Sequence, residues 1–154
     1  MPPRDSRMHE TLLFSSCVLS APQPKVAALL LAVEPGAVGA ENAWLFDREI
    51  GATLEGGPTV FHYRSPQGAG TIELEPGRSI RYTGGWWYRA TYTVTETEAS
   101  TRVTLQIENA AAQPGWLVRL ANPGWRTVVS VGHTQFEQKM RDAAARLGCA
   151  VEFV

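Results

Sequence analysis

Five short runs with strand-forming character follow one another between residues 59 and 109. Only a few Gly, Pro or polar residues separate each run from the next. Links this short join neighbouring antiparallel strands. The segment therefore predicts a meander of antiparallel hairpins, with strands at Thr59–Ser65, Gly70–Glu75, Arg78–Thr83, Trp86–Glu96 and Thr101–Asn109.

Apolar and polar residues alternate along these runs, which is typical of strands with one buried and one solvated face. Arg89 and Thr91 fall between the apolar residues of the fourth run, and Arg102 and Thr104 fall between those of the fifth. Hairpin pairing would align the apolar residues across the sheet. The predicted buried face consists of Ile72, Leu74, Ile80, Tyr82, Tyr88, Ala90, Tyr92, Val94, Val103, Leu105 and Ile107.

One strand and two helices are expected before the meander. Residues Glu10–Leu19 are rich in β-branched, aromatic and aliphatic types and predict the strand. The tetrapeptide Ser20–Gln23 matches a capping box, so a helix should begin there and stop before Pro35-Gly36. A short second helix is expected over Ala40–Phe46.

A long helix is expected after the meander. Asn122-Pro123 combines an N-cap residue with proline at the first helical position. Apolar residues then recur at helical intervals over about seven turns, which predicts a stripe buried against the sheet. The stripe consists of Val128, Val131, Phe136, Met140, Ala143 and Leu147.

The length and composition indicate one domain. A chain of 154 residues with 44% hydrophobic residues can bury a sizeable core. We expect residues 1–7 to form a disordered leader and residues 8–154 to form the domain.

The longest apolar stretch, Val26–Val33, is far shorter than the roughly 20 residues that cross a bilayer. Glu10 interrupts any signal-peptide pattern, so membrane insertion is not expected and the protein is predicted to be cytoplasmic.

Charge and cysteine content exclude several other classes. With 14 basic and 15 acidic residues the net charge is -1, so no field attracts a polyanion and nucleic acid is not an expected partner. Cys17 and Cys149 have neither disulfide-framework nor zinc-ligand spacing, and we interpret both as reduced, buried thiols.

The order of elements resembles the helix-grip fold of the SRPBCC superfamily, which includes START, pollen-allergen and polyketide cyclase/dehydratase families. Three stretches carry the resemblance: LSAPQPKVAALLLAV, GTIELEPGRSIRYTG and YRATYTVTETEASTRVTLQIE. The chain departs from common members in its turn at Glu55–Pro58 and in its tail at Cys149–Val154. The resemblance implies an α+β fold in which a curved antiparallel β-sheet wraps around a long C-terminal helix. It also implies a hydrophobic ligand held between the two.

No motif supplies a metal, a cofactor or a catalytic centre. His9, His62 and His133 lack metal-ligand spacing, so neither a metal nor a cofactor is predicted. Ser130, His133 and Glu137 share one face of the terminal helix, but side chains on one helix rarely converge into a hydrogen-bonded triad. We therefore expect a polar patch there, and the catalytic residues stay unknown.

The candidate ligand-binding residues lie on the predicted inner face, the strand before it and the terminal helix. Three tyrosines of the inner face carry hydroxyls that would need a partner or water if buried. His62 and Arg64 compete with Phe61 and Tyr63 for the core side of their strand, so their orientation stays open. The full candidate set is Tyr82, Tyr88, Tyr92, His62, Arg64, Trp87, Leu105, Trp125 and Val128.

Three functions fit this sequence. The first is binding of a small hydrophobic or aromatic molecule between the sheet and the C-terminal helix. The second is an enzyme like the polyketide cyclases and dehydratases, which would require polar groups converging in the pocket. The third is an interaction domain like the ATPase activators of the same superfamily, which would require a filled core and an exposed apolar patch. The sequence leaves the oligomeric state open.

Overall fold

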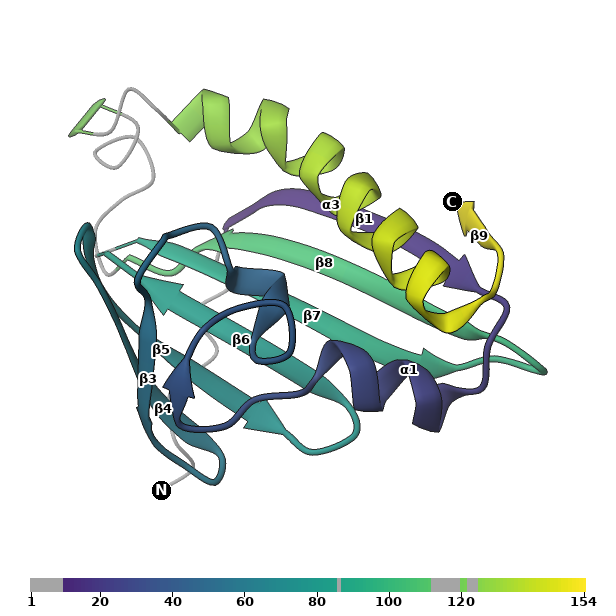
Figure 1. Cartoon of the computed structure of the whole chain (residues 1–154). Coiled ribbons are helices and arrows are strands. Elements are labelled where there is room, and N and C mark those ends of the chain that lie inside the picture. Colours follow the sequence, from purple (N-terminus) through teal and green to yellow (C-terminus); the bar gives the residue numbers. More distant parts are fainter. Residues whose placement is uncertain (1–9, 86, 112–119, 122–124) are drawn as a thin grey trace, which may run out of the picture.

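The computed structural model describes residues 10–85, 87–111, 120–121 and 125–154. Within these residues one antiparallel sheet curves beneath two α-helices (Figure 1). The helices are α1 (Gln23–Leu30), the 3-10 helix η1 (Trp44–Phe46) and α3 (Trp125–Leu147). The strands are β1 (Glu10–Leu19), β2 (Gly36–Ala37), β3 (Thr53–Gly56), β4 (Val60–Ser65), β5 (Gly68–Glu75), β6 (Ser79–Gly84), β7 (Tyr88–Glu96), β8 (Thr101–Asn109) and β9 (Val151–Phe153).

The predicted meander is confirmed. Strands β3 to β8 pair with their neighbours in chain order, and β1 closes onto β8, so the sheet order is β2-β3-β4-β5-β6-β7-β8-β1-β9. Strands β1 and β8 have the predicted bounds. Strands β3 and β9 were not predicted, because four and three residues are too few for alternation to be recognised.

The inner face of the sheet forms most of the core. Eight of its predicted members are buried, namely Ile72, Ile80, Ala90, Tyr92, Val94, Val103, Leu105 and Ile107. Leu74, Tyr82 and Tyr88 are partly buried and pack against this cluster. Alternation therefore predicted the correct face on every strand of the meander on which it was used.

Helix α3 packs against β1 and β9, and α1 packs against β7 and α3. Phe136, Met140 and Ala143 of the predicted stripe are buried. Val131 is 40% exposed, which corrects its assignment to the core. The side chain of Val128, and the expected N-terminal cap at Asn122-Pro123, lie outside the described part of the chain.

The prediction of a capping box at the start of α1 is wrong. The N-cap residue is Pro22, and no side chain caps the helix. The Ser20 hydroxyl instead accepts a hydrogen bond from the Ala150 backbone N–H at 2.8 Å, and the Gln23 amide donates to the Gly77 carbonyl at 2.6 Å. Both side chains therefore bind segments distant in sequence rather than the local helix terminus.

The expected helix over Ala40–Phe46 is reduced to the single turn η1. Ala43 adopts a left-handed conformation with φ of 49°, which interrupts a right-handed helix. The Asn42 amide accepts from the Glu34 N–H at 2.9 Å and donates to the carbonyls of Glu34 and Ala37. Side-chain bonds of this kind give the backbone an alternative to helical hydrogen bonds.

Trp44 joins the three helices. Its indole nitrogen donates to the Leu29 carbonyl of α1 at 3.0 Å. Lys139 and Arg146 of α3 lie over its ring, 5.1 and 4.6 Å from the centroid. The Lys139 ammonium also donates to the Trp44 carbonyl at 2.7 Å and pairs with Asp47. These contacts hold the segment that follows η1 beneath α3.

Candidate functional site

A hollow in the inner face of the sheet begins with two facing glycines. Gly70 of β5 pairs with Gly84 of β6, and Tyr63 and Tyr88 flank this pair in the same cross-strand row. Neither glycine carries a side chain, so the sheet surface is recessed between the two tyrosines. The ring of Tyr82 occupies this recess: a Cβ on Gly70 would lie 2.8 Å from its Cε2.

Aromatic rings surround the space above Tyr82. The Phe46 ring stacks on Tyr82 with centroids 5.6 Å apart. Tyr63 and Tyr88 meet Tyr82 edge to face, at 5.2 and 6.1 Å. The rings enclose one side of a cavity of about 110 Å³, whose lining is Phe46, Arg48, Glu49, Tyr63, Tyr82 and Tyr88.

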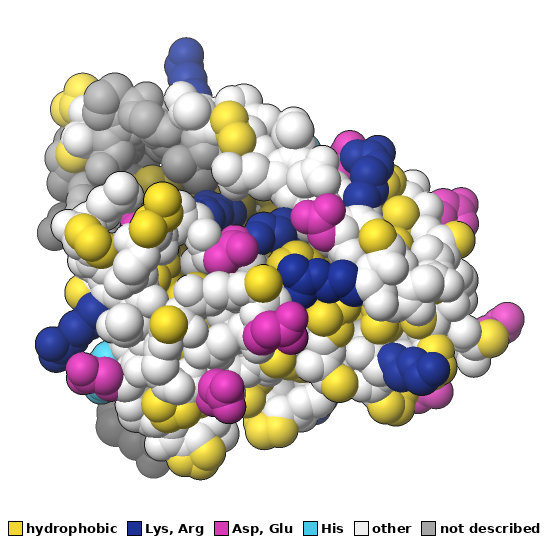
Figure 2. Space-filling view, in the orientation of Figure 1, with side chains coloured by type: hydrophobic (Ala, Val, Ile, Leu, Met, Phe, Trp, Pro, Cys, Tyr) yellow, Lys and Arg dark blue, Asp and Glu magenta, His cyan; other side chains and the backbone are white. Residues whose placement is uncertain are grey.

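Arg48 also lines a second cavity of about 170 Å³, which reaches α3. Ile107 of β8 forms its floor, and Gly132 on α3 approaches so closely that a Cβ there would lie 2.8 Å from Leu13. Figure 2 shows basic and acidic side chains gathered along the boundary between α3 and the segment around η1. Arg48 is therefore common to a cavity under η1 and a cavity under α3. The remaining lining residues are Thr127, Val131 and Gln135.

Some polar groups of the first cavity have hydrogen-bond partners within the described residues, and one has none. The Tyr63 hydroxyl donates to the Phe46 carbonyl at 3.1 Å, and Arg48 Nη1 donates to the Tyr88 hydroxyl at 3.3 Å. The Oε2 atom of Glu49 is buried and has no hydrogen-bond partner among the described residues. Buried polar atoms are normally paired, so Glu49 Oε2 is available to a ligand or a water molecule.

The environment keeps the tyrosines in their phenol form. Burial raises the pKa of Tyr63 to about 12, and the nearby charge of Glu49 adds to this increase. Burial also raises the pKa of Tyr82, again with a contribution from Glu49. Burial raises the pKa of Tyr92, although the Arg48 charge opposes the shift. At neutral pH all three hydroxyls can donate as well as accept hydrogen bonds.

The pKa of Arg48 is raised as well. Desolvation is the largest single effect and lowers it, but Tyr88, Tyr92 and Tyr82 together raise it by more. The guanidinium is therefore a permanent positive charge at the junction of the two cavities.

Five of the predicted ligand-binding residues lie on or near the inner face. Tyr82 and Tyr88 line the first cavity. Trp87 is partly buried and meets Tyr88 edge to face at 5.7 Å, beside the cavity rather than on its wall. Tyr92 and Leu105 are 2% and 1% exposed and belong to the core, which removes them from the cavity lining.

His62 and Arg64 lie on the opposite face of the sheet. Both are exposed, whereas Phe61 and Tyr63 on the same strand are buried. The alternation of side chains along β4 allows only one pair to face inward, and the larger buried area belongs to the aromatic pair. We therefore remove His62 and Arg64 from the proposed pocket. The side chains of Trp125 and Val128 lie outside the described residues.

Four residues of the cavity wall were not among the predicted ligand-binding residues: Phe46, Arg48, Glu49 and Tyr63. The first three belong to η1 and the loop after it, where no periodic pattern indicates which side chains point inward. Tyr63 was considered only as a competitor for the core side of its strand. The pair of glycines at positions 70 and 84 was a usable signal, because glycine within a strand often marks close approach by another group.

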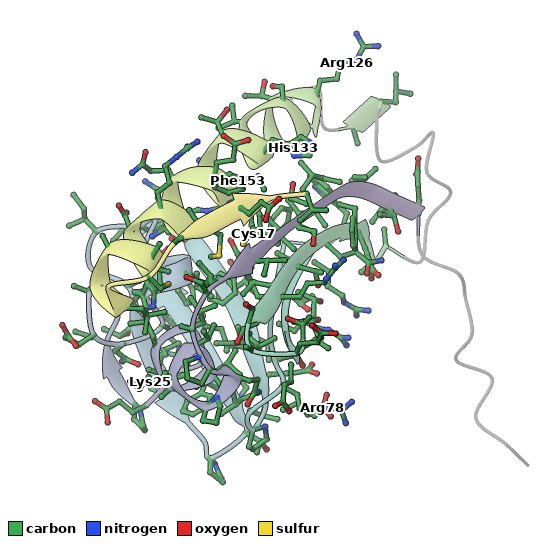
Figure 3. The ribbon with its side chains drawn as sticks, turned by 90° about the vertical axis from the view of Figure 1, so that its right-hand side faces the viewer. Cys17, Lys25, Arg78, Arg126, His133 and Phe153 are labelled. Carbon is green, nitrogen blue, oxygen red and sulfur yellow. The ribbon has the colours of Figure 1, made fainter. Side chains whose placement is uncertain are left out.

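Ser130, His133 and Glu137 form no triad. Ser130 donates to the Thr127 carbonyl at 3.1 Å, and Glu137 pairs with Arg141 at 3.4 Å. His133 Nδ1 lies 2.5 Å from the Ser15 hydroxyl, where α3 passes β1 (Figure 3). This contact joins the helix to the strand, and neither residue lines either cavity.

The described part of the chain offers no candidate metal centre. There, no three His, Cys, Asp or Glu side chains gather in a group able to hold a metal ion. None of the helices placed by the structure combines the length and the apolar character needed to cross a membrane.

A curved antiparallel sheet with a long helix packed on its inner side is the architecture that the sequence resemblance predicted. The chain has a helix-grip fold. No family model matches the sequence, and no curated protein matches it. Similar proteins are found among solved structures, and each match covers most of this chain.

Three of these structures illustrate the match. TTHA0849 from Thermus thermophilus has a TM-score of 0.48 at 15% identity, over 87% of this chain and 97% of that protein. PFC0360w, an HSP90 activator from Plasmodium falciparum, has 0.45 at 16% identity, over 91% and 98%. CalU16 from Micromonospora echinospora has 0.43 at 14% identity, over 88% and 82%. Identities this low restrict the similarity to the fold.

Proposed function

We propose that the protein binds a small hydrophobic or aromatic molecule in the cavity formed by Phe46, Tyr63, Tyr82 and Tyr88. The aromatic lining carries the proposal, because four rings from three strands and η1 surround one space. Ligand sites are typically concave and apolar, with a few polar groups that fix orientation. Arg48 and Glu49 are those groups here. The second cavity extends the site towards the C-terminal helix.

A binding experiment with a filled-cavity variant tests this proposal. Phenol, toluene and hexanol are added to 15N-labelled protein, and amide chemical shifts are followed by NMR. We expect the aromatic compounds to shift amides of Phe46, Tyr63 and Tyr88, and Glu49→Phe to abolish these shifts by occupying the cavity. Glu41→Phe makes the same change on an exposed position of the preceding loop and should bind normally. Equal binding by both variants, or no shift with any compound, would refute the proposal.

An enzymatic function like that of cyclases and dehydratases is the second candidate. The buried Oε2 of Glu49 without a partner favours it, since a carboxylate in an aromatic pocket can accept a proton from a carbon acid. Arg48 would then stabilise the negative oxygen that forms. Incubation with an aromatic 1,3-diketone in D2O tests the idea by comparing the rate of deuterium uptake at the central carbon with the uncatalysed rate. Glu49→Gln should reduce the rate to the uncatalysed value while retaining binding.

No observation favours the interaction-domain alternative. A row across the outer face runs through Phe14, Gln106, Thr91, Arg81, Glu73 and Val60. Its two exposed apolar residues lie at opposite ends, separated by polar and charged ones. Along this row, therefore, no contiguous apolar patch of the kind that such a domain would use is present.

We also propose that the protein acts in the cytoplasm. Cys17 and Cys149 are both free thiols. Free thiols persist where the environment is reducing, whereas exported proteins tend to oxidise theirs. Fractionation of cells expressing the protein, with detection by antibody, tests this location directly.

A further inference from the structure

We propose that the ligand is a single-ring aromatic acid that carries a ring hydroxyl, with its carboxylate bound by Arg48 and its hydroxyl by Glu49. The inference rests on the proposed aromatic-binding function and names the chemical class of its ligand. It follows from the size of the first cavity, from the hydrogen-bonding capacity of Arg48 and from the unpaired oxygen of Glu49.

The size of the first cavity limits the aromatic part. Its volume is about 110 Å³, smaller than the roughly 150 Å³ of an enclosed apolar cavity that holds benzene, so even one ring has to extend into the open side of the cavity. A fused two-ring system would have to displace one of the four aromatic side chains. Because Tyr82 is confined between Phe46 and the glycine pair, it has no free space into which to move. One six-membered ring is therefore the largest aromatic group that fits without rearrangement.

The capacity of Arg48 indicates an anion. A guanidinium carries five N–H donors in a planar fork that matches a carboxylate. Arg48 makes one hydrogen bond with another described residue, at 3.3 Å to the Tyr88 hydroxyl, and no ion pair. Of the two carboxylates beside it in sequence, Asp47 is paired with Lys139. The remaining donors of Arg48 are thus available at the junction of the two cavities.

Glu49 determines the other end of the ligand. Its Oε2 atom is buried in the wall of the same cavity and accepts no hydrogen bond from a described residue. An ionised carboxylate accepts hydrogen bonds and repels a second anion. A ring hydroxyl donating to Glu49 would satisfy this oxygen, while the acid group lies at Arg48. The two side chains together select a molecule with an acid at one end and a donor at the other.

Titration calorimetry with matched compounds tests the inference. The compounds are 4-hydroxybenzoate, the neutral 4-hydroxybenzyl alcohol, benzoate without the hydroxyl, and 6-hydroxy-2-naphthoate with a second ring. We expect 4-hydroxybenzoate to bind at least about tenfold more tightly than each of the others. Arg48→Met should remove the preference for the acid over the alcohol, and Glu49→Gln should change the preference for the hydroxyl. Arg64→Met, which removes an exposed arginine from the outer face, should change neither.

The outcomes separate this inference from the proposed function. If the neutral alcohol binds as well as the acid, or if Arg48→Met retains the preference, the acid class is wrong while aromatic binding stands. If none of the compounds binds, both fall. Arg48→Lys retains the charge without the planar fork and should bind with intermediate affinity. Since Arg48 is exposed, its variants should fold, and melting temperatures within a few degrees of the wild type would verify this.

Discussion

The ring of Tyr82 lies directly against the backbone of Gly84, so closely that a Cβ on Gly84 would lie 2.6 Å from its Cε1 atom. Gly70, opposite Gly84 in the sheet, is equally close to the same ring. Tyr82 therefore lies flat along the sheet rather than upright, and the space above it remains open as the aromatic cavity. The two glycines determine the depth of the proposed site.

Replacing Gly84 by alanine should therefore destabilise the fold by about 1–3 kcal/mol, as other overpacking substitutions do. The new methyl group has to displace the Tyr82 ring, which Phe46 covers on its other side. Urea unfolding measures the change. Gly39→Ala is the matched control, because nothing lies within 4 Å of a Cβ there. In a Tyr82→Ala background, Gly84→Ala should reduce the free energy of unfolding by less, because the ring that the methyl group would displace is absent. An unchanged loss of stability would show that the effect comes from the backbone of β6 and not from Tyr82.

Lys139 should contribute more to stability than an exposed basic residue. Its ammonium donates to the Trp44 carbonyl, pairs with Asp47 and lies over the Trp44 ring. We expect Lys139→Met to cost about 1–3 kcal/mol in urea unfolding. Arg78→Met removes an exposed pair with Glu75 and should change stability by less than about 0.5 kcal/mol. Equal losses of stability in the two variants would contradict the role of Lys139 in holding the η1 segment against α3.

Ser20 should stabilise the C-terminal strand rather than helix α1. Its hydroxyl accepts from the Ala150 N–H, directly before β9. In Ser20→Ala we expect faster hydrogen–deuterium exchange at Ala150 and along Val151–Phe153, with unchanged exchange in α1. Ser65→Ala, whose hydroxyl bonds only within the turn after β4, serves as control. Faster exchange in α1 instead would restore the capping interpretation.

Stability should decrease in alkaline solution partly because of Cys17. Burial raises the pKa of this thiol from 9.0 to about 12. In the unfolded chain the thiol ionises near pH 9, while in the folded chain it stays protonated. The stabilisation is therefore complete below about pH 9 and is lost as the pH rises towards about 12.

Urea unfolding between about pH 8 and pH 11 measures this loss. Cys17→Ala should show a smaller decrease than the wild type, whereas Cys149→Ala, which removes only a minor contribution to the Cys17 shift, should stay close to the wild type. Tyr63, whose pKa is also raised to about 12, contributes equally to all three proteins. In the native state a thiol reagent should modify the partly exposed Cys149 well before the buried Cys17. The same alkaline slope in all three proteins would exclude Cys17 as a source.

The orientation of β4 illustrates the limit of local patterns. Both sets of alternating residues on this strand contain large side chains, so the pattern alone favoured neither. Pairing of Phe61 with Ile72 and of Tyr63 with Gly70 places the aromatic residues on the inner face. His62 and Arg64 face outward as a consequence. A decision between two faces thus depended on the neighbouring strand and not on β4 itself.

The cavity wall shows the same limit more strongly. Tyr82 and Tyr88 were found because alternation identified their face. Arg48 and Glu49 lie in a segment of turns, where no period relates one side chain to the next. Their inward position depends on Trp44, whose contacts with α1 and α3 hold the segment over the sheet.

Residue patterns along the chain were sufficient to predict the meander, its buried face and the long terminal helix. These follow from periods of about two and 3.6 residues, which depend only on near neighbours in the chain. The position of Tyr82 over two glycines, and that of Arg48 between two cavities, depend on the tertiary packing. Those relationships arise from strand register and from contacts between residues far apart in the chain. No local pattern encodes them, because each depends on where the rest of the molecule has packed.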